Sequence, residues 1–182
     1  MGEEVKEDRG GREWKRPAEG WVKINCDGAF KIKQGSVIEN EAGIGMVIKN
    51  ENREMVAGIA KKVLVGSSIE AEAVALREGV WLAVERKMHR IMLETDSEIL
   101  YKEITGRRKM GCWKIKPCIE DILKKRDSFI KFECSKINRL ANKAANWVAH
   151  QVRKGMCLAN WVLLPPSSLV YILNKDGLPE PL

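Results

Sequence analysis

Residues 21–30 read WVKINCDGAF, and this stretch decides how the rest of the chain is interpreted. Apolar and polar residues alternate from position 22 to position 27, which is the period of a β-strand. We expect the strand to stop at Gly28, because glycine suits a turn or a bulge, and Asp27 then lies at its end. An Asp-Gly pair is commonly a turn. The alternative is that Asp27 is one ligand of a metal cluster whose other members lie elsewhere in the chain.

The length and composition are those of one globular domain with tails. The chain has 182 residues, of which 45% are hydrophobic and 31% are charged, as in folded proteins. No apolar run approaches the roughly 20 residues that span a bilayer, and the N-terminus lacks the apolar core of a signal peptide. We therefore expect no membrane association and no secretion. Five cysteines without metal-ligand spacing favour reduced thiols in the cytoplasm or the nucleus.

The net charge of +7 is unevenly distributed along the chain. Residues 1–20 are rich in glycine and charge and lack periodicity, so we expect a disordered N-terminal tail. Residues 156–182 contain a Pro-Pro pair and a short apolar patch, and we expect an extension that can dock on the domain. The excess of basic residues lies between the tails, in a domain at residues 21–155. A basic domain favours a polyanionic partner, and we expect the protein to be a monomer.

Hydrophobic periodicity and turn residues predict elements in the order β-β-β-α-β-α-α-β-α. The strands are expected within the stretch 21–30, where the strand stops at Gly28, and at residues 42–49, 54–65, 89–94 and 128–134. The helices are expected at residues 68–88, 97–104, 117–127 and 140–154. Short loops join the first three strands, which predicts an antiparallel meander.

Two further acids occupy positions that need an explanation. Glu72 falls inside the apolar stripe of the first helix, where burying an unpaired carboxylate is unfavourable. The alternative is that this end of the helix projects into solvent, where the helix dipole favours an acid. Asp96 follows the fourth strand at a junction where Asp is usually an N-cap. Thr95 and Ser97 could cap that helix instead, which favours another purpose for Asp96.

The loop at residues 106–116 combines basic residues with an aromatic one. Such interleaving suits contact with phosphates and stacking on bases. We interpret the loop as a nucleic-acid contact, with a solvated surface loop as the alternative. Its candidate residues are Arg107, Arg108, Lys109, Trp113, Lys114 and Lys116.

The three acids lie in motifs that resemble those of a known family. The segments INCDGAF, IEAEAVALREGV, IMLETDS and NRLANKAANWVA follow one another in the chain. Together they resemble the landmarks of the ribonuclease H type 1 fold, and more narrowly the plant RNase-H-like domains related to retroelement reverse transcriptases. The resemblance covers about residues 21–155. It implies an α/β RNase H-like fold, in which a mixed five-stranded sheet carries helices on both faces.

The resemblance also implies an active site with four acidic positions. It assigns Asp27, Glu72 and Asp96 to three of them, as ligands of Mg²⁺ or, as a substitute, Mn²⁺. The fourth acid of the family motif is replaced here by Asn146. An amide oxygen can still bind Mg²⁺, but it is neutral and a weaker ligand than a carboxylate.

Two functions are compatible with the resemblance. The first is a divalent-metal-dependent endonuclease that cleaves the RNA strand of RNA–DNA hybrids, with reduced activity because of Asn146. The alternative is a catalytically inactive nucleic-acid-binding domain derived from a retroelement. The implied partner is an RNA–DNA hybrid, recognised through its phosphates and 2′-hydroxyls. Asn25 and Asn142, which lie within the matched motifs, are implied as further nucleic-acid contacts.

Overall fold

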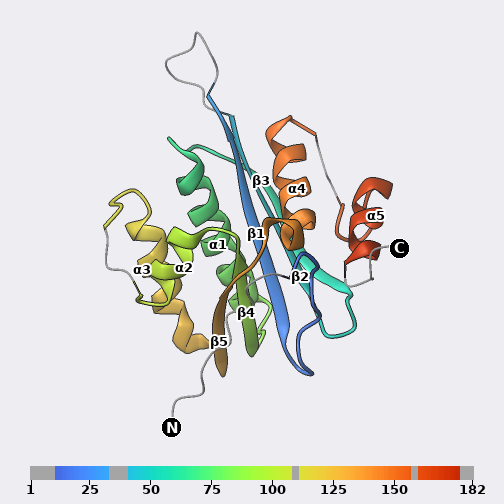
Figure 1. The fold of residues 1–182 in the computed structure, drawn as a ribbon, viewed down its shortest axis with the longest axis horizontal. Coiled ribbons are helices and arrows are strands. Elements are labelled where there is room, and N and C mark those ends of the chain that lie inside the picture. Colours follow the sequence, from blue (N-terminus) through green and yellow to red (C-terminus); the bar gives the residue numbers. More distant parts are fainter. Residues whose placement is uncertain (1–10, 33–40, 108–110, 157–159, 177–182) are drawn as a thin grey trace.

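The computed structural model describes residues 11–32, 41–107, 111–156 and 160–176. Within them, one sheet has the strand order β3-β2-β1-β4-β5 (Figure 1). Its strands are β1 (Val22–Lys31), β2 (Glu41–Lys49), β3 (Met55–Val63), β4 (Arg90–Thr95) and β5 (Lys131–Lys136). The first three strands are antiparallel, and β4 and β5 run parallel to β1. The predicted mixed sheet is confirmed.

Helices cover both faces of this sheet (Figure 1). The helices are α1 (Ser68–Glu85), α2 (Glu98–Ile104), α3 (Lys116–Lys125), α4 (Lys143–Arg153) and α5 (Ser167–Lys175), with short 3₁₀ turns η1 (Arg126–Ser128) and η2 (Arg139–Asn142). Helices α1 to α3 lie on one side of the sheet, and α4 and α5 lie on the other. None of the helices in the described chain is long and apolar enough to cross a membrane.

Gly28 allows α1 to pack directly against β1. A Cβ atom at Gly28 would lie 2.5 Å from the backbone nitrogen of Glu72, closer than side chains approach a backbone. The strand runs through Gly28 to Lys31, so the prediction that it stops there is wrong. Glycine marks a close approach of two backbones here, not a turn. This approach brings Glu72 next to the part of β1 that carries Asp27.

The opposite face of the sheet makes an equally close contact with α4. Gly45 of β2 is the cross-strand partner of Asp27, and a Cβ there would lie 2.4 Å from the carbonyl oxygen of Ala145. Paired residues of neighbouring strands point to the same face. Asp27 therefore faces α4, whose first turn carries Asn146.

Each face of the sheet has its own hydrophobic cluster. The α1 side contains, among others, Ile24, Cys26, Leu76, Val80, Ile91, Leu93 and Ile122. The α4 side contains Val47, Ala144, Val148, Val152, Trp161 and Leu169. Trp161 and Leu169 belong to the C-terminal extension, so its described part contributes to the second cluster.

Trp14 is buried although it lies in the span expected to be a disordered tail. Its side chain is 1% exposed, and its Nε1 donates a hydrogen bond to Oδ1 of Asn25 at 2.9 Å. The expectation for residues 1–20 is therefore wrong at Trp14. A single large aromatic side chain supplies apolar burial that a count of charges and glycines does not reveal. Residues 1–10 lie outside the described chain.

Candidate active site

Asp27 sits in the middle of β1 with only 6% of its surface exposed. Its Oδ1 accepts a hydrogen bond from the backbone N–H of Gly28 at 2.8 Å, and its Oδ2 accepts one from Nδ2 of Asn146 at 2.6 Å. Burial raises the pKa of Asp27 to about 6, although the Asn146 hydrogen bond opposes this, and the charge of Asp96 adds to the rise. Both oxygens of this carboxylate are thus held by N–H groups.

Glu72 projects from α1 beside Asp27 and is half-buried. Burial is the main cause that raises the pKa of Glu72 to about 7, and the charges of Asp96 and Asp27 raise it further. A hydrogen bond with Ser97 acts in the opposite direction. The alternative of a solvated helix start does not fit a carboxyl group in this environment. The acid that stabilises the start of α1 is Glu70, which accepts a hydrogen bond from the backbone N–H of Gly66 at 3.2 Å.

Asp96 follows β4 and does not cap α2. The N-cap is Ser97, whose hydroxyl oxygen accepts the N–H of Leu100 at 3.5 Å. The hydroxyl of Thr95 accepts the N–H of Ser97 at 3.1 Å. Burial raises the pKa of Asp96. Ser97 thus takes the capping role, as the sequence allows, and the carboxylate of Asp96 is not used to cap α2.

The three acids come from β1, α1 and the end of β4, and they lie close enough for their charges to interact. Against the raising effect of burial, the charge of Arg139 lowers the pKa of all three. Arg139 begins η2, just before α4, and its side chain is exposed. It was missing from the predicted site residues. Its signal in the sequence is only a base shortly before the last helix.

The chemistry of the site fits a hard divalent cation. Its donors are carboxylate and amide oxygens, which Mg²⁺ prefers, and the raised pKa values of Asp27 and Glu72, caused first by burial, reflect uncompensated acids. The acids that the resemblance implies as Mg²⁺ ligands are near one another, but they do not form a preformed metal pocket. Within the described ranges, no three acidic, histidine or cysteine side chains are grouped closely enough to hold a metal ion. Asn146 instead points an N–H group at Asp27.

The described part of the predicted nucleic-acid loop, residues 111–116, borders the N-terminal end of α1. Trp113 is 76% exposed, as a stacking side chain requires. Nζ of Lys114 lies 3.5 Å from Oε1 of Glu70, two residues before Glu72. Lys116 pairs instead with Glu120 on α3, at 3.8 Å.

The contacts of Arg107, and the position of Arg108 and Lys109 outside the described residues, do not test their predicted role in nucleic-acid binding. The guanidinium of Arg107 lies 5.4 Å from the ring centre of Tyr101 on α2. Arg108 and Lys109 fall outside the described residues.

Asn25 and Asn142 were implied as nucleic-acid contacts, and the structure corrects this. Each side chain is 1% exposed. Nδ2 of Asn25 donates to Oε2 of Glu94 at 2.7 Å, and Nδ2 of Asn142 donates to the backbone oxygen of Cys26 at 2.9 Å. Both amides form hydrogen bonds inside the protein. Asn25 links β1 to β4, and Asn142 links β1 to the start of α4. A side chain so deeply buried does not reach a partner.

The fold and the arrangement of acids define the class: the protein has the ribonuclease H fold. Ribonuclease H1 of the archaeon Halobacterium salinarum NRC-1 is 20% identical with a TM-score of 0.66, covering 75% of this chain and 100% of that chain. LC11-RNase H1, solved in complex with an RNA/DNA hybrid, is 18% identical with a TM-score of 0.63, covering 75% and 99%. Likeness at these identities shows the fold alone.

The chain belongs to the reverse transcriptase-like family, which matches residues 25–152. The resemblance to ribonuclease H domains is thereby confirmed. A protein of Arabidopsis thaliana that is named as a ribonuclease H protein is 32% identical over 87 residues. This match covers 48% of the present chain and 13% of the relative, so it spans only a small part of the relative's length.

Proposed function

We propose that the protein is a divalent-metal-dependent endonuclease that cleaves the RNA strand of RNA–DNA hybrids. The observation that carries the proposal is that Asp27, Glu72 and Asp96 lie near enough for their charges to interact, and that burial raises the pKa of each. Gathering three acids in a partly buried site is unfavourable for folding. Such a group is explained by a function that uses its charge, namely binding a cation.

Asp27, Glu72 and Asp96 would hold the metal after their side chains draw closer together than they lie in the metal-free protein, and Asn146 would add its amide oxygen after its side chain turns. A bound divalent ion supplies an activated water and stabilises the leaving oxygen in phosphodiester hydrolysis. The N–H of Gly28 holds Oδ1 of Asp27 in a fixed orientation. Arg139 faces the same acids with a positive charge and is suited to bind a phosphate of the substrate strand.

The surface beside the acids supports a nucleic-acid substrate. The ion pair between Lys114 and Glu70 holds the described end of the loop, at residues 111–116, next to the end of α1 that carries Glu72. Exposed Trp113 is suited to stack on a base or a sugar. The RNA/DNA hybrid bound by LC11-RNase H1 supports the same substrate class. Recognition of the RNA strand would use its 2′-hydroxyls, with phosphate contacts that weaken in salt.

A second candidate function is hybrid binding without turnover, and one observation favours it. Asn146 replaces an acid of the family motif, and its N–H group donates to Oδ2 of Asp27 at 2.6 Å. This hydrogen bond occupies an oxygen that a metal would need.

A cleavage assay separates the two candidates. Purified protein is incubated with an end-labelled RNA–DNA hybrid in Mg²⁺ or Mn²⁺, beside Asp27→Asn and the control Asp127→Asn, whose side chain is 91% exposed. Cleavage of the RNA strand is expected to require the metal, to fall at least about 100-fold in Asp27→Asn, and to persist in the control. Hybrid binding without cleavage in either metal would support the second candidate and contradict the first.

A further inference from the structure

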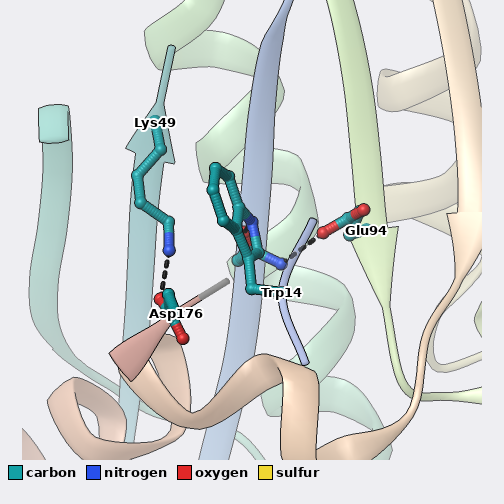
Figure 2. A network of polar contacts seen from close by, with 5 residues as sticks. Trp14, Lys49, Glu94 and Asp176 are labelled. Atoms are coloured by element: carbon teal, nitrogen blue, oxygen red, sulfur yellow. Dashed lines mark hydrogen bonds and ion pairs between the residues drawn. The ribbon is translucent and has the colours of Figure 1, made fainter. Parts of the chain in front are cut away.

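A buried network of polar contacts links β1 to β4 (Figure 2). It lies just before Asp27 on β1 and just before Asp96, which follows β4. Asn25 and Glu94 form the last pair in the parallel register of these strands. Each lies two residues before an acid, Asp27 on β1 and Asp96 after β4. Nδ2 of Asn25 donates to Oε2 of Glu94 at 2.7 Å, and the two residues are 1% and 3% exposed. This hydrogen bond is therefore a tie between the strands at the point where their pairing ends.

Further contacts fix the orientation of both side chains in the hydrogen bond between Asn25 and Glu94. Nε1 of Trp14 donates to Oδ1 of Asn25 at 2.9 Å, so the amide can donate only toward Glu94. Nζ of Lys23 lies 2.6 Å from Oε1 of Glu94, so both oxygens of that carboxylate have partners. In Figure 2, Trp14 lies between Glu94 on one side and Lys49 on the other. Lys49 forms an ion pair with Asp176.

Trp14 also lies near the segment that leads into α4. With Ile137, Asn138 and Ala141 it lines a narrow cavity beside η2. Arg139 begins this turn, and Asn146 follows it in the first turn of α4. The Trp14 side chain thus bonds to β1 and shares a cavity with the segment that brings Asn146 to Asp27.

We propose that Trp14, acting through Asn25 and Glu94, is a positioning residue for the acids of the site. Without its N–H group, the Asn25 amide is free to turn, and the tie between β1 and β4 weakens at the end that carries Asp27 and Asp96. The proposal rests on the proposed function for its consequence in catalysis. It also extends the functional unit beyond the family match, which begins at residue 25.

The decisive variant is Trp14→Phe, which keeps an aromatic ring and removes only the N–H donor and part of the ring. The turnover rate kcat for hybrid cleavage is expected to fall about tenfold while KM changes less than about twofold, because partners behind a metal ligand set typically have effects of this size. Glu94→Gln, which retains the shape of the side chain, is expected to act in the same direction and serves if Trp14→Phe folds poorly.

Asp176→Asn is the matched control, because it weakens the ion pair with Lys49 on the other side of Trp14. It is expected to lower the melting temperature and to leave kcat and KM unchanged. Equal falls in melting temperature in Trp14→Phe and Asp176→Asn, with unchanged kcat in both, would overturn the proposal and leave Trp14 with a structural role only.

A metal-free readout keeps this test separate from the proposed function. The side-chain amide of Asn146, which donates to Asp27, gives its own NMR signals. These signals are expected to shift in Trp14→Phe and to stay in place in Asp176→Asn. If the wild-type protein does not cleave hybrids, the proposed function fails, and the amide signals still decide whether Trp14 positions the acids. Unmoved signals in Trp14→Phe would refute the positioning role.

Discussion

Replacing Glu72 with glutamine is expected to stabilise the metal-free protein at neutral and mildly alkaline pH. Burial, followed by the charges of Asp96 and Asp27, raises the pKa of Glu72 from 4.5 to about 7. Between these two values the folded protein binds more protons at Glu72 than the unfolded chain does. The free energy of unfolding therefore decreases as the pH rises through this window. Glutamine carries no charge, so the variant escapes this loss.

The magnitude follows from the size of the pKa shift. The rise from 4.5 to about 7 corresponds to an upper limit of about 3 kcal/mol at pH 8, at about 1.4 kcal/mol for each pKa unit. Solvent screening reduces this limit because Glu72 is only half-buried, so we expect about 1–2 kcal/mol.

Urea unfolding in EDTA at pH 5 and pH 8 measures the effect. The free energy of unfolding of Glu72→Gln, minus that of the wild type, is expected to be larger at pH 8 than at pH 5. The contributions of titrating groups that both proteins share cancel in this difference. Glu85→Gln, at an exposed position of the same helix, is the control and should show no such increase. Adding Mg²⁺ at pH 8 should stabilise the wild type more than Glu72→Gln. A difference that is equal at both pH values, or that favours the wild type at pH 8, would refute the reasoning.

Two further substitutions test the site from its two sides. Asn146→Asp removes the N–H donor to Asp27 and adds a like charge, so it should destabilise the metal-free protein at pH 8 and tighten Mg²⁺ binding in calorimetry. Unchanged Mg²⁺ affinity would mean that position 146 lies outside the metal ligand set. Gly28→Ala would push a Cβ to 2.5 Å from the α1 backbone and should lower the free energy of unfolding. We expect a loss of about 3 kcal/mol in urea unfolding. Gly111→Ala meets no atom within 4 Å and should be neutral, and an equally neutral Gly28→Ala would disprove the close approach of α1 to β1.

The order of the elements up to α4, though not the added helix α5, and two of the acids could be predicted because their signals are local. The helical stripe of α1 is visible within one stretch, and Glu72 is conspicuous inside it. The capping residues Thr95 and Ser97 flank Asp96, so their redundancy can also be read locally. In each case the residues that decide the interpretation are near neighbours in the chain.

The remaining features depend on contacts between distant parts of the chain. The neighbours of Gly28 in the chain favour a turn. The reason for a glycine there is the close contact with α1, which begins about 40 residues later. The resemblance implies Asn25 as a nucleic-acid contact, but the side chain is buried against Glu94, which is 69 positions away in the chain. Trp14 lies in a stretch whose average composition is that of a disordered tail, and its burial depends on the sheet that receives it. Local periodicity carries no information on such partners.

Anomalous diffraction from crystals grown or soaked with Mn²⁺ tests the central claim most directly. We expect a manganese peak within ligand distance of carboxylate oxygens of Asp27, Glu72 and Asp96, with the Asn146 side chain turned from its hydrogen bond to Asp27. Fully occupied manganese elsewhere on the surface, with none at these three acids and the Asn146 hydrogen bond intact, would contradict it.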